Sequence, residues 1–88
     1  MKRIKNIMSQ ILLKDAKFTG NIESSNEFYI EFHEDGTYFK FEVSLAEDDY
    51  CEMTILVDGD VYDVVGDITI ADIADRIEAL TFKVIMGS

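Results

Sequence analysis

Two alternating segments joined by an Asp-Gly turn constrain the fold of this chain more than any other feature. Residues 26–33 and 37–45 each place large apolar side chains at every second position, as a strand with one buried face does. Asp35 and Gly36 between them form a favoured hairpin turn, because both residues tolerate positive φ. The turn fixes the register, and a slip by one residue would turn every apolar side chain to the wrong face. The expected apolar pairs are Phe32 with Phe39, Ile30 with Phe41 and Phe28 with Val43, and the expected wet-side pairs are Glu31 with Lys40 and Tyr29 with Glu42.

A second hairpin follows the same logic. Residues 51–57 alternate, Asp58 and Gly59 repeat the turn signal, and residues 60–65 return. Unbroken pairing from this turn places Ile55 opposite Tyr62 and Met53 opposite Val64 on the core side. The outer side would then hold Thr54 opposite Asp63, together with Leu56, Val61 and Val65. Gly66 and Asp67 are expected to end the sheet.

Helical spacing marks both ends of the chain. Apolar residues recur at three- and four-residue intervals within residues 4–12, which predicts a helix over residues 2–14. Thr69 resembles an N-cap, with Asp72 in the capping-box position, and an apolar stripe runs from Ile70 to Leu80. Residues 82–86 are expected to form a short fifth strand or an apolar tail on the sheet. Gly20 and Asn21 suggest a turn or an irregular strand.

The element order predicts a single α+β domain spanning residues 1–88. It consists of an N-terminal helix, a four-stranded antiparallel meander, a C-terminal helix and the short fifth strand. The sheet has one clearly apolar face and each helix one apolar stripe, so both helices are expected on one face of the sheet.

Charge is the most unusual part of the composition. The chain carries 18 acidic and 8 basic residues, a formal net charge of −10. Five of the basic residues lie within residues 1–17, and residues 41–75 contain no positive side chain. Such a field repels nucleic acid and anionic membranes and attracts basic surfaces. A basic protein surface, and no direct nucleic acid or membrane, is therefore the expected partner.

The acidic residues of the predicted sheet and its loops, with interleaved tyrosines, are the expected partner-binding surface, since exposed tyrosines among acids suit an interface. This predicted set is Glu42, Glu47, Asp48, Asp49, Glu52, Asp58, Asp60, Asp63, Asp67, Tyr50 and Tyr62.

The parts needed for catalysis are missing from the pattern. Cys51 and His33 are the only residues of their kinds, and the alternation sends them to opposite faces of the sheet. The glycines are isolated, so no Gly-rich loop precedes a helix to cradle phosphate. The chain is expected not to be an enzyme and to use no cofactor or metal. A calcium site built from Asp58, Asp60 and Asp63 with Asp67 is an open alternative, although their spacing is not that of an EF-hand.

The expected location is the cytoplasm. No apolar run approaches the roughly 20 residues of a membrane helix. The basic N-terminus is interrupted by polar residues where a signal peptide would be apolar. One cysteine, Cys51, cannot form an internal disulfide, which agrees with a reducing compartment.

In size, charge and helix-plus-meander pattern, the whole chain resembles the small acidic inhibitors of bacteriophages and mobile elements, including anti-CRISPR and DNA-mimic proteins. The resemblance implies an inhibitor that occupies the basic nucleic-acid-binding surface of a nuclease such as a CRISPR effector. Two alternatives stay open: an immunity protein or antitoxin that neutralises a basic toxin, and an acidic accessory or oligomerisation domain. The sequence leaves the oligomeric state open.

Overall fold

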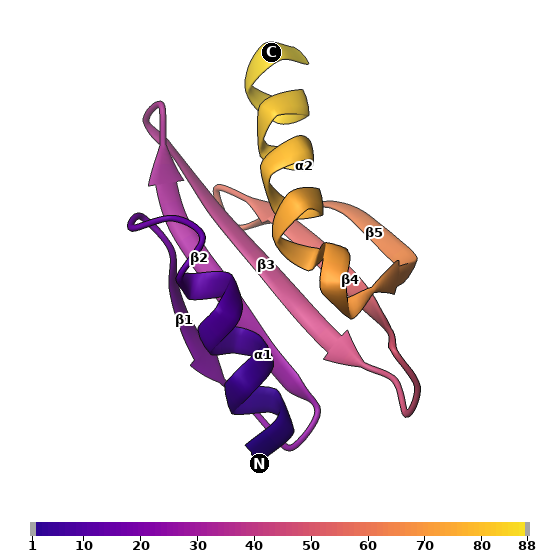
Figure 1. Ribbon diagram of the computed structural model, residues 1–88. Coiled ribbons are helices and arrows are strands. Elements are labelled where there is room, and N and C mark those ends of the chain that lie inside the picture. The colour runs from indigo at the N-terminus through magenta and orange to yellow at the C-terminus, as the bar shows by residue number, and fades with distance from the viewer. Residues whose placement is uncertain (1, 88) are drawn as a thin grey trace.

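A computed structural model describes residues 2–87 of the chain. Along the sequence, five consecutive strands lie between two α-helices (Figure 1). The elements are α1 (Lys2–Leu12), β1 (Thr19–Ile22), β2 (Glu27–Glu34), β3 (Thr37–Leu45), β4 (Tyr50–Val57), β5 (Asp60–Thr69), the 3₁₀ turn η1 (Ile70–Asp72) and α2 (Ile73–Gly87).

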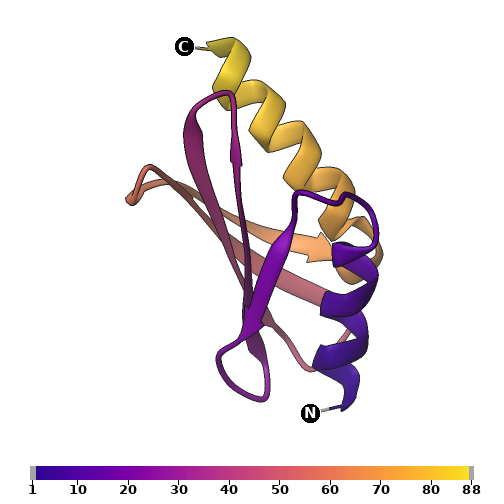
Figure 2. The same ribbon diagram turned by 90° about the vertical axis from the view of Figure 1, so that its left-hand side faces the viewer.

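The strands form one antiparallel meander in the order β1-β2-β3-β4-β5. Both helices pack on the same face of this sheet (Figure 2), which confirms the expected two-layer α+β architecture. We call the opposite face of the sheet the outer face. The sheet is strongly twisted, so the β4–β5 turn points away from the β2–β3 turn in Figure 2.

The first hairpin has the predicted register throughout, including Phe32 opposite Phe39 and Glu31 opposite Lys40. Asp35 and Gly36 adopt positive φ values of 54° and 77°, as the turn requires. Phenylalanines of the two strands stack at the centre of the core, and the ring centroids of Phe32 and Phe39 lie 5.4 Å apart. The correct turn residues and the aromatic pairing therefore specify the same register.

The second hairpin departs from its predicted register. Val57 pairs with Asp60 and Leu56 with Val61 as expected, but Ile55 pairs with Asp63 instead of Tyr62. A second irregularity lies between Cys51 and Met53. Each bulge adds a residue to β5. As a result Val65 packs against the core and Val64 is exposed, the reverse of the prediction.

The prediction that Gly66 and Asp67 end the sheet is also wrong. Strand β5 continues to Thr69, and Ile68 is buried in the core opposite Cys51. Asp67 has a φ of 55°, a left-handed conformation within the strand. Gly66 and Asp67 lie at a β-bulge, and the strand continues through them because a bulge accepts a residue with positive φ.

The fifth strand comes from the segment around Gly20 and Asn21, for which the sequence left a turn or an irregular strand open, and not from residues 82–86. Residues 19–22 form β1, which pairs with β2. Gly20 is closely surrounded there: an added Cβ would sit 2.9 Å from Cδ1 of Ile30 and 3.0 Å from the backbone oxygen of Tyr29, both in β2, and 3.2 Å from Sδ of Met8 in α1. Absence of a side chain at this position thus lets β1 fit between β2 and α1.

Residues 82–86 belong to α2 and form neither a strand nor an extended tail. The helical stripe continues past Leu80 through Thr81, which is buried, and Val84 and Ile85, which pack against the core. This burial at helical intervals outweighs the β-propensity of the segment. At the other end of the chain, α1 stops at Leu12, and Leu13 is exposed.

The Thr69 hydroxyl donates to Oδ2 of Asp72 at 2.6 Å, and no side-chain bond caps the backbone of η1. Thr69 therefore leads into a 3₁₀ turn before α2 begins. The Cα radius of gyration is 12.2 Å, close to the value of about 12 Å for a compact chain of this length. Within residues 2–87, neither helix has the length and apolar character needed to cross a bilayer.

The packing predicts a large loss of stability when one phenylalanine is truncated and almost none when another is. Phe41→Ala removes a fully buried ring and should lower the free energy of unfolding by about 3–5 kcal/mol. Phe82→Ala should change it by less than about 0.5 kcal/mol, because Phe82 is exposed on α2. Urea denaturation measures both. A large loss for Phe82→Ala would mean that the Phe82 ring is buried and not exposed.

Candidate functional site: an acidic strip across the sheet

The structure divides the predicted partner-binding set between the two ends of β4. Glu47, Asp48 and Asp49 form the β3–β4 loop, with Tyr50 beginning β4. The second group, Asp58, Asp60, Tyr62 and Asp63, lies at and beyond the β4–β5 turn. Strand β4 has eight residues, so about 25 Å separates the two groups. One compact ligand cannot contact the whole set at once.

Part of the set joins other acids in a continuous surface. Two adjoining hollows, of about 310 Å³ and 450 Å³, share Ser44 and Glu52 in their walls. Tyr50, half-exposed, lines the second hollow. We call the carboxylates of these two hollows the acidic strip; they are Glu23, Glu27, Glu42, Glu52 and Asp67.

Sheet register sets the spacing within the acidic strip. Glu27 pairs with Ser44, and Ser44 pairs with Glu52. Paired residues point to the same face, so the backbones of Glu27 and Glu52 lie about 9–10 Å apart on either side of β3. Glu42 is two residues from Ser44 along β3, about 7 Å away on the same face. Three of the five acids are therefore held by central strands at fixed intervals.

Little positive charge compensates the acidic strip. Nζ of Lys40 lies 3.8 Å from Oε2 of Glu42 and 4.3 Å from the centroid of the Tyr29 ring. Among residues 2–87, this is the one ion pair that the strip makes. The Glu27 carboxylate also accepts the Ser24 hydroxyl at 3.1 Å, which supplies a hydrogen bond but no positive charge.

Arg3, one of the basic residues near the N-terminus, binds the β3–β4 loop through main-chain oxygens and not through its carboxylates. Its guanidinium donates to the backbone carbonyls of Ala46, at 3.4 Å, and Asp48, at 2.8 Å. The Asp48 carboxylate instead accepts the N–H of Tyr50 at 3.0 Å. Arg3 thus ties α1 to the loop through the main chain, and within the described residues it forms no ion pair with a carboxylate of the loop.

Lys17 forms its ion pairs on the helix side of the molecule. Its Nζ donates to Glu34 and lies 3.3 Å from Asp15 and 3.9 Å from Glu78. Burial disfavours the charge, but hydrogen bonds to Glu34 and Asp15 outweigh it and raise the pKa of Lys17. The pKa of Asp15 is lowered, chiefly by the backbone N–H of Lys17. This cation is therefore committed to the fold and lies away from the acidic strip.

Aspartates around the β4–β5 turn serve the local backbone. Asp58 has a φ of 51° and its carboxylate accepts the N–H of Tyr38 at 2.9 Å. Asp63 accepts the N–H of Val64 at 2.8 Å. In the part of the chain that the structure describes, no three His, Cys, Asp or Glu side chains are placed to hold a metal ion together. The calcium site that the sequence left open therefore has no such group of ligands at this turn.

Cys51 and His33 do not meet. Cys51 is buried in the core beneath the helices, and burial raises the pKa of its thiol to about 11. His33 is on the outer face, where its ring lies 5.2 Å from that of Tyr38. A hydrogen bond to Glu31 raises the pKa of Tyr38 to about 12. The arrangement does not activate the thiol as a nucleophile.

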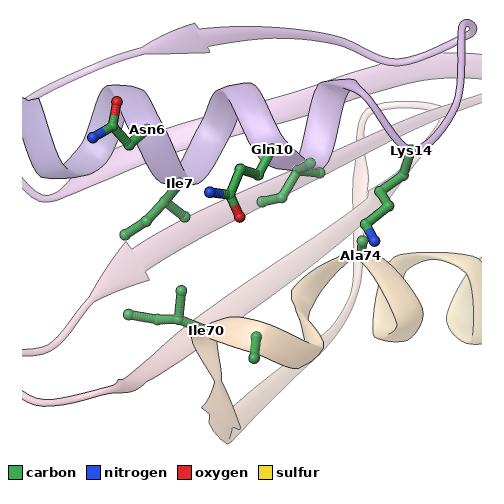
Figure 3. A pocket seen from close by; sticks show the side chains of 8 residues that line it. Asn6, Ile7, Gln10, Lys14, Ile70 and Ala74 are labelled. Carbon is green, nitrogen blue, oxygen red and sulfur yellow. The ribbon is translucent and has the colours of Figure 1, made fainter.

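A groove lies between the helices (Figure 3), which cover the face of the sheet opposite the outer face. Ile7 of α1, Ile70 of η1 and Ala74 of α2 form its apolar walls. Asn6 and Gln10 of α1, and Lys14 just after α1, line its rim. A second hollow of about 710 Å³ extends the groove to Arg3 and Asp49. Asp49 of the predicted set therefore lies beside this groove and not in the acidic strip.

The predicted set omits two acids of the strip. Glu27 could have been found from the sequence, because the Asp35-Gly36 turn pairs it with Ser44 on the outer face. Glu23 lies between β1 and β2, and no pattern in the sequence placed that segment. Of the predicted residues, the strip gathers Glu42, Glu52 and Asp67, with Tyr50 beside them.

Burial of Cys51 predicts a slow thiol. At pH 8 the folded protein should react with Ellman's reagent at least about 100-fold more slowly than the urea-unfolded protein, since both access and thiolate fraction are low. The absorbance of the released thiolate measures the rate. A folded rate equal to the unfolded rate would mean that Cys51 reaches solvent.

Comparisons with protein families, with curated proteins and with solved structures find no match to this chain. The acidic strip gathers five carboxylates around two adjoining hollows, with one ion pair in the described part of the chain, and it is the candidate functional site.

Proposed function

We propose that this protein is an acidic inhibitor that binds the basic nucleic-acid-binding surface of a nuclease, such as a CRISPR effector, as a DNA mimic. The observation that supports the proposal is the acidic strip, in which five carboxylates line two adjoining hollows and one ion pair is made. In this role the strip takes the place of the nucleic-acid backbone. The protein would act in the cytoplasm, where such enzymes meet their substrates.

A nucleic-acid cleft is a chemically suitable partner. Such clefts concentrate Lys and Arg side chains, whose charge-assisted hydrogen bonds to anionic oxygens are stronger than neutral ones. The strip offers Glu27, Glu42 and Glu52 from neighbouring strands at intervals of about 7–10 Å. A cleft could engage several of them at once.

Rigidity favours binding by this face. The inner side chains next to the strip's acids, Phe28, Val43 and Met53, are buried in the core. The backbones that carry Glu27, Glu42 and Glu52 are thereby held in the sheet before a partner arrives. Preorganisation reduces the entropy lost on binding, and complementary charge raises the association rate.

Neutralising the acidic strip should weaken partner binding selectively. We expect the triple variant Glu27→Gln, Glu42→Gln, Glu52→Gln to bind its partner at least about 10-fold more weakly at about 0.15 M salt, because three charge-assisted contacts are lost. The partner is first captured from bacterial lysate on the immobilised protein, eluted with duplex DNA and identified. Calorimetry with the purified partner then gives the dissociation constants.

The matched control removes three negative charges elsewhere. Asp35→Asn, Asp75→Asn, Glu78→Gln changes the β2–β3 turn and α2 and should alter the affinity by less than about 3-fold, since long-range charge alone is screened. Equal losses in both variants would show that net charge, not the strip, governs binding. Capture of a basic toxin that DNA does not displace would replace the nuclease with a toxin as the partner.

A further inference from the structure

The second feature of the molecule that suits a partner is the open edge of β5. Among residues 2–87, β5 pairs with β4 on one side and with no strand on the other. It is ten residues long, whereas the opposite edge strand, β1, has four residues. An open edge presents unpaired backbone N–H and C=O groups to any extended chain that can reach it.

Apolar side chains flank this edge. Val61 is 63% exposed, Tyr62 47% and Val64 51%, in a strand where only Ile68 is buried. Val61 and Val64 pair with Leu56 and Thr54 and so share the outer face with them. Tyr62 lies at the bulge and lines a hollow with Lys83 of α2. An added strand would find apolar neighbours on both faces of β5.

A carboxylate covers the edge backbone in the isolated chain. Oδ1 of Asp63 accepts the N–H of Val64 at 2.8 Å. A side chain that satisfies its neighbour's amide in this way substitutes for a missing strand. An incoming carbonyl would replace it and release the carboxylate for another contact.

Charge selects the kind of strand that can add. Asp60, Asp63 and Asp67 lie along β5, and no basic residue occurs in it. A second copy of β5 would bring aspartates of two strongly acidic chains together, which is destabilising. A strand with lysine or arginine would instead place opposite charges across the new pair.

We propose that the open edge of β5 accepts an extended, cationic segment of the partner protein as a sixth strand. Main-chain hydrogen bonds hold the segment, its basic side chains contact Asp60 and Asp63, and its apolar side chains pack beside Val61 and Val64. The inference rests on the proposed function only in taking the partner to be basic. It adds a second contact surface, at the edge of the sheet, to the acidic strip.

The test is a titration of the ¹⁵N-labelled full chain with a seven-residue peptide that alternates lysine and valine, followed by NMR up to millimolar peptide. Amide shifts should change most at residues 60–65. The same peptide N-methylated at alternate amides keeps its charge but cannot pair as a strand, and it should bind at least about 10-fold more weakly. A peptide alternating glutamate and valine should leave these amides unchanged.

Two variants at one position locate the contact. Val64→Pro removes the amide that Asp63 covers and should abolish the shifts, since proline is tolerated on edge strands but cannot donate. Val64→Thr keeps the amide and the β-branched shape and should bind as the original protein does. Thermal melting reports whether Val64→Pro folds, and the N-methylated peptide decides the question on the unaltered chain if it does not.

The outcomes separate this inference from the proposed function. Equal binding of the N-methylated peptide, shifts confined to the acidic strip, or no shift at millimolar peptide would each overturn strand addition, whatever the captured partner is. The Glu27→Gln, Glu42→Gln, Glu52→Gln variant should still add the peptide at β5. Strand addition without capture of any nucleic-acid enzyme would remove the proposed function and leave the edge site standing.

Discussion

The register of the β2–β3 hairpin is the constraint on which the rest of this structure depends. Positive φ at Asp35 and Gly36 sets it, and it gathers the phenylalanines of both strands on one face. Helices α1 and α2 can then cover that face (Figure 2). The alternation that buries Phe41 and Val43 also turns Glu42 outward between them. The core and the acidic strip are therefore two results of a single pairing.

Regular pairing could be predicted from the sequence, and irregular pairing could not. The β2–β3 register follows from one turn and one alternation, and so does the presence of Glu27 beside Glu42 on the outer face. The bulge at Tyr62 has no such local signal, because it depends on how β5 meets β4 and α2. Gly66 and Asp67 have the composition of a stop but lie inside a strand. Both errors in β5 therefore lie where tertiary contacts override a local preference.

The second organising feature of the molecule is the separation of its positive side chains from its acidic surfaces. Two of the five cations near the N-terminus bind the chain itself: Arg3 binds main-chain carbonyls of the β3–β4 loop, and Lys17 contacts three acids on the helix side. Lys40 is the one cation on the outer face of β3. The fold thus leaves the acidic strip and the β5 edge as neighbouring negative surfaces. A partner that uses both would need a basic cleft next to an extended basic segment.

The placement of Lys17 bears on how the protein responds to concentrated salt. Its side chain is 25% exposed, and its Nζ lies 5.2 Å from the centroid of the Phe32 ring and 5.6 Å from that of Phe18. The carboxylates that Lys17 contacts, on Asp15, Glu34 and Glu78, are 34%, 36% and 50% exposed, so added electrolyte weakens this cluster as well as the acidic strip. The buried phenylalanines of β2 and β3 carry no charge and hold the sheet together under the same conditions. Concentrated salt should therefore release a basic partner while the core stays folded, so that dilution restores binding.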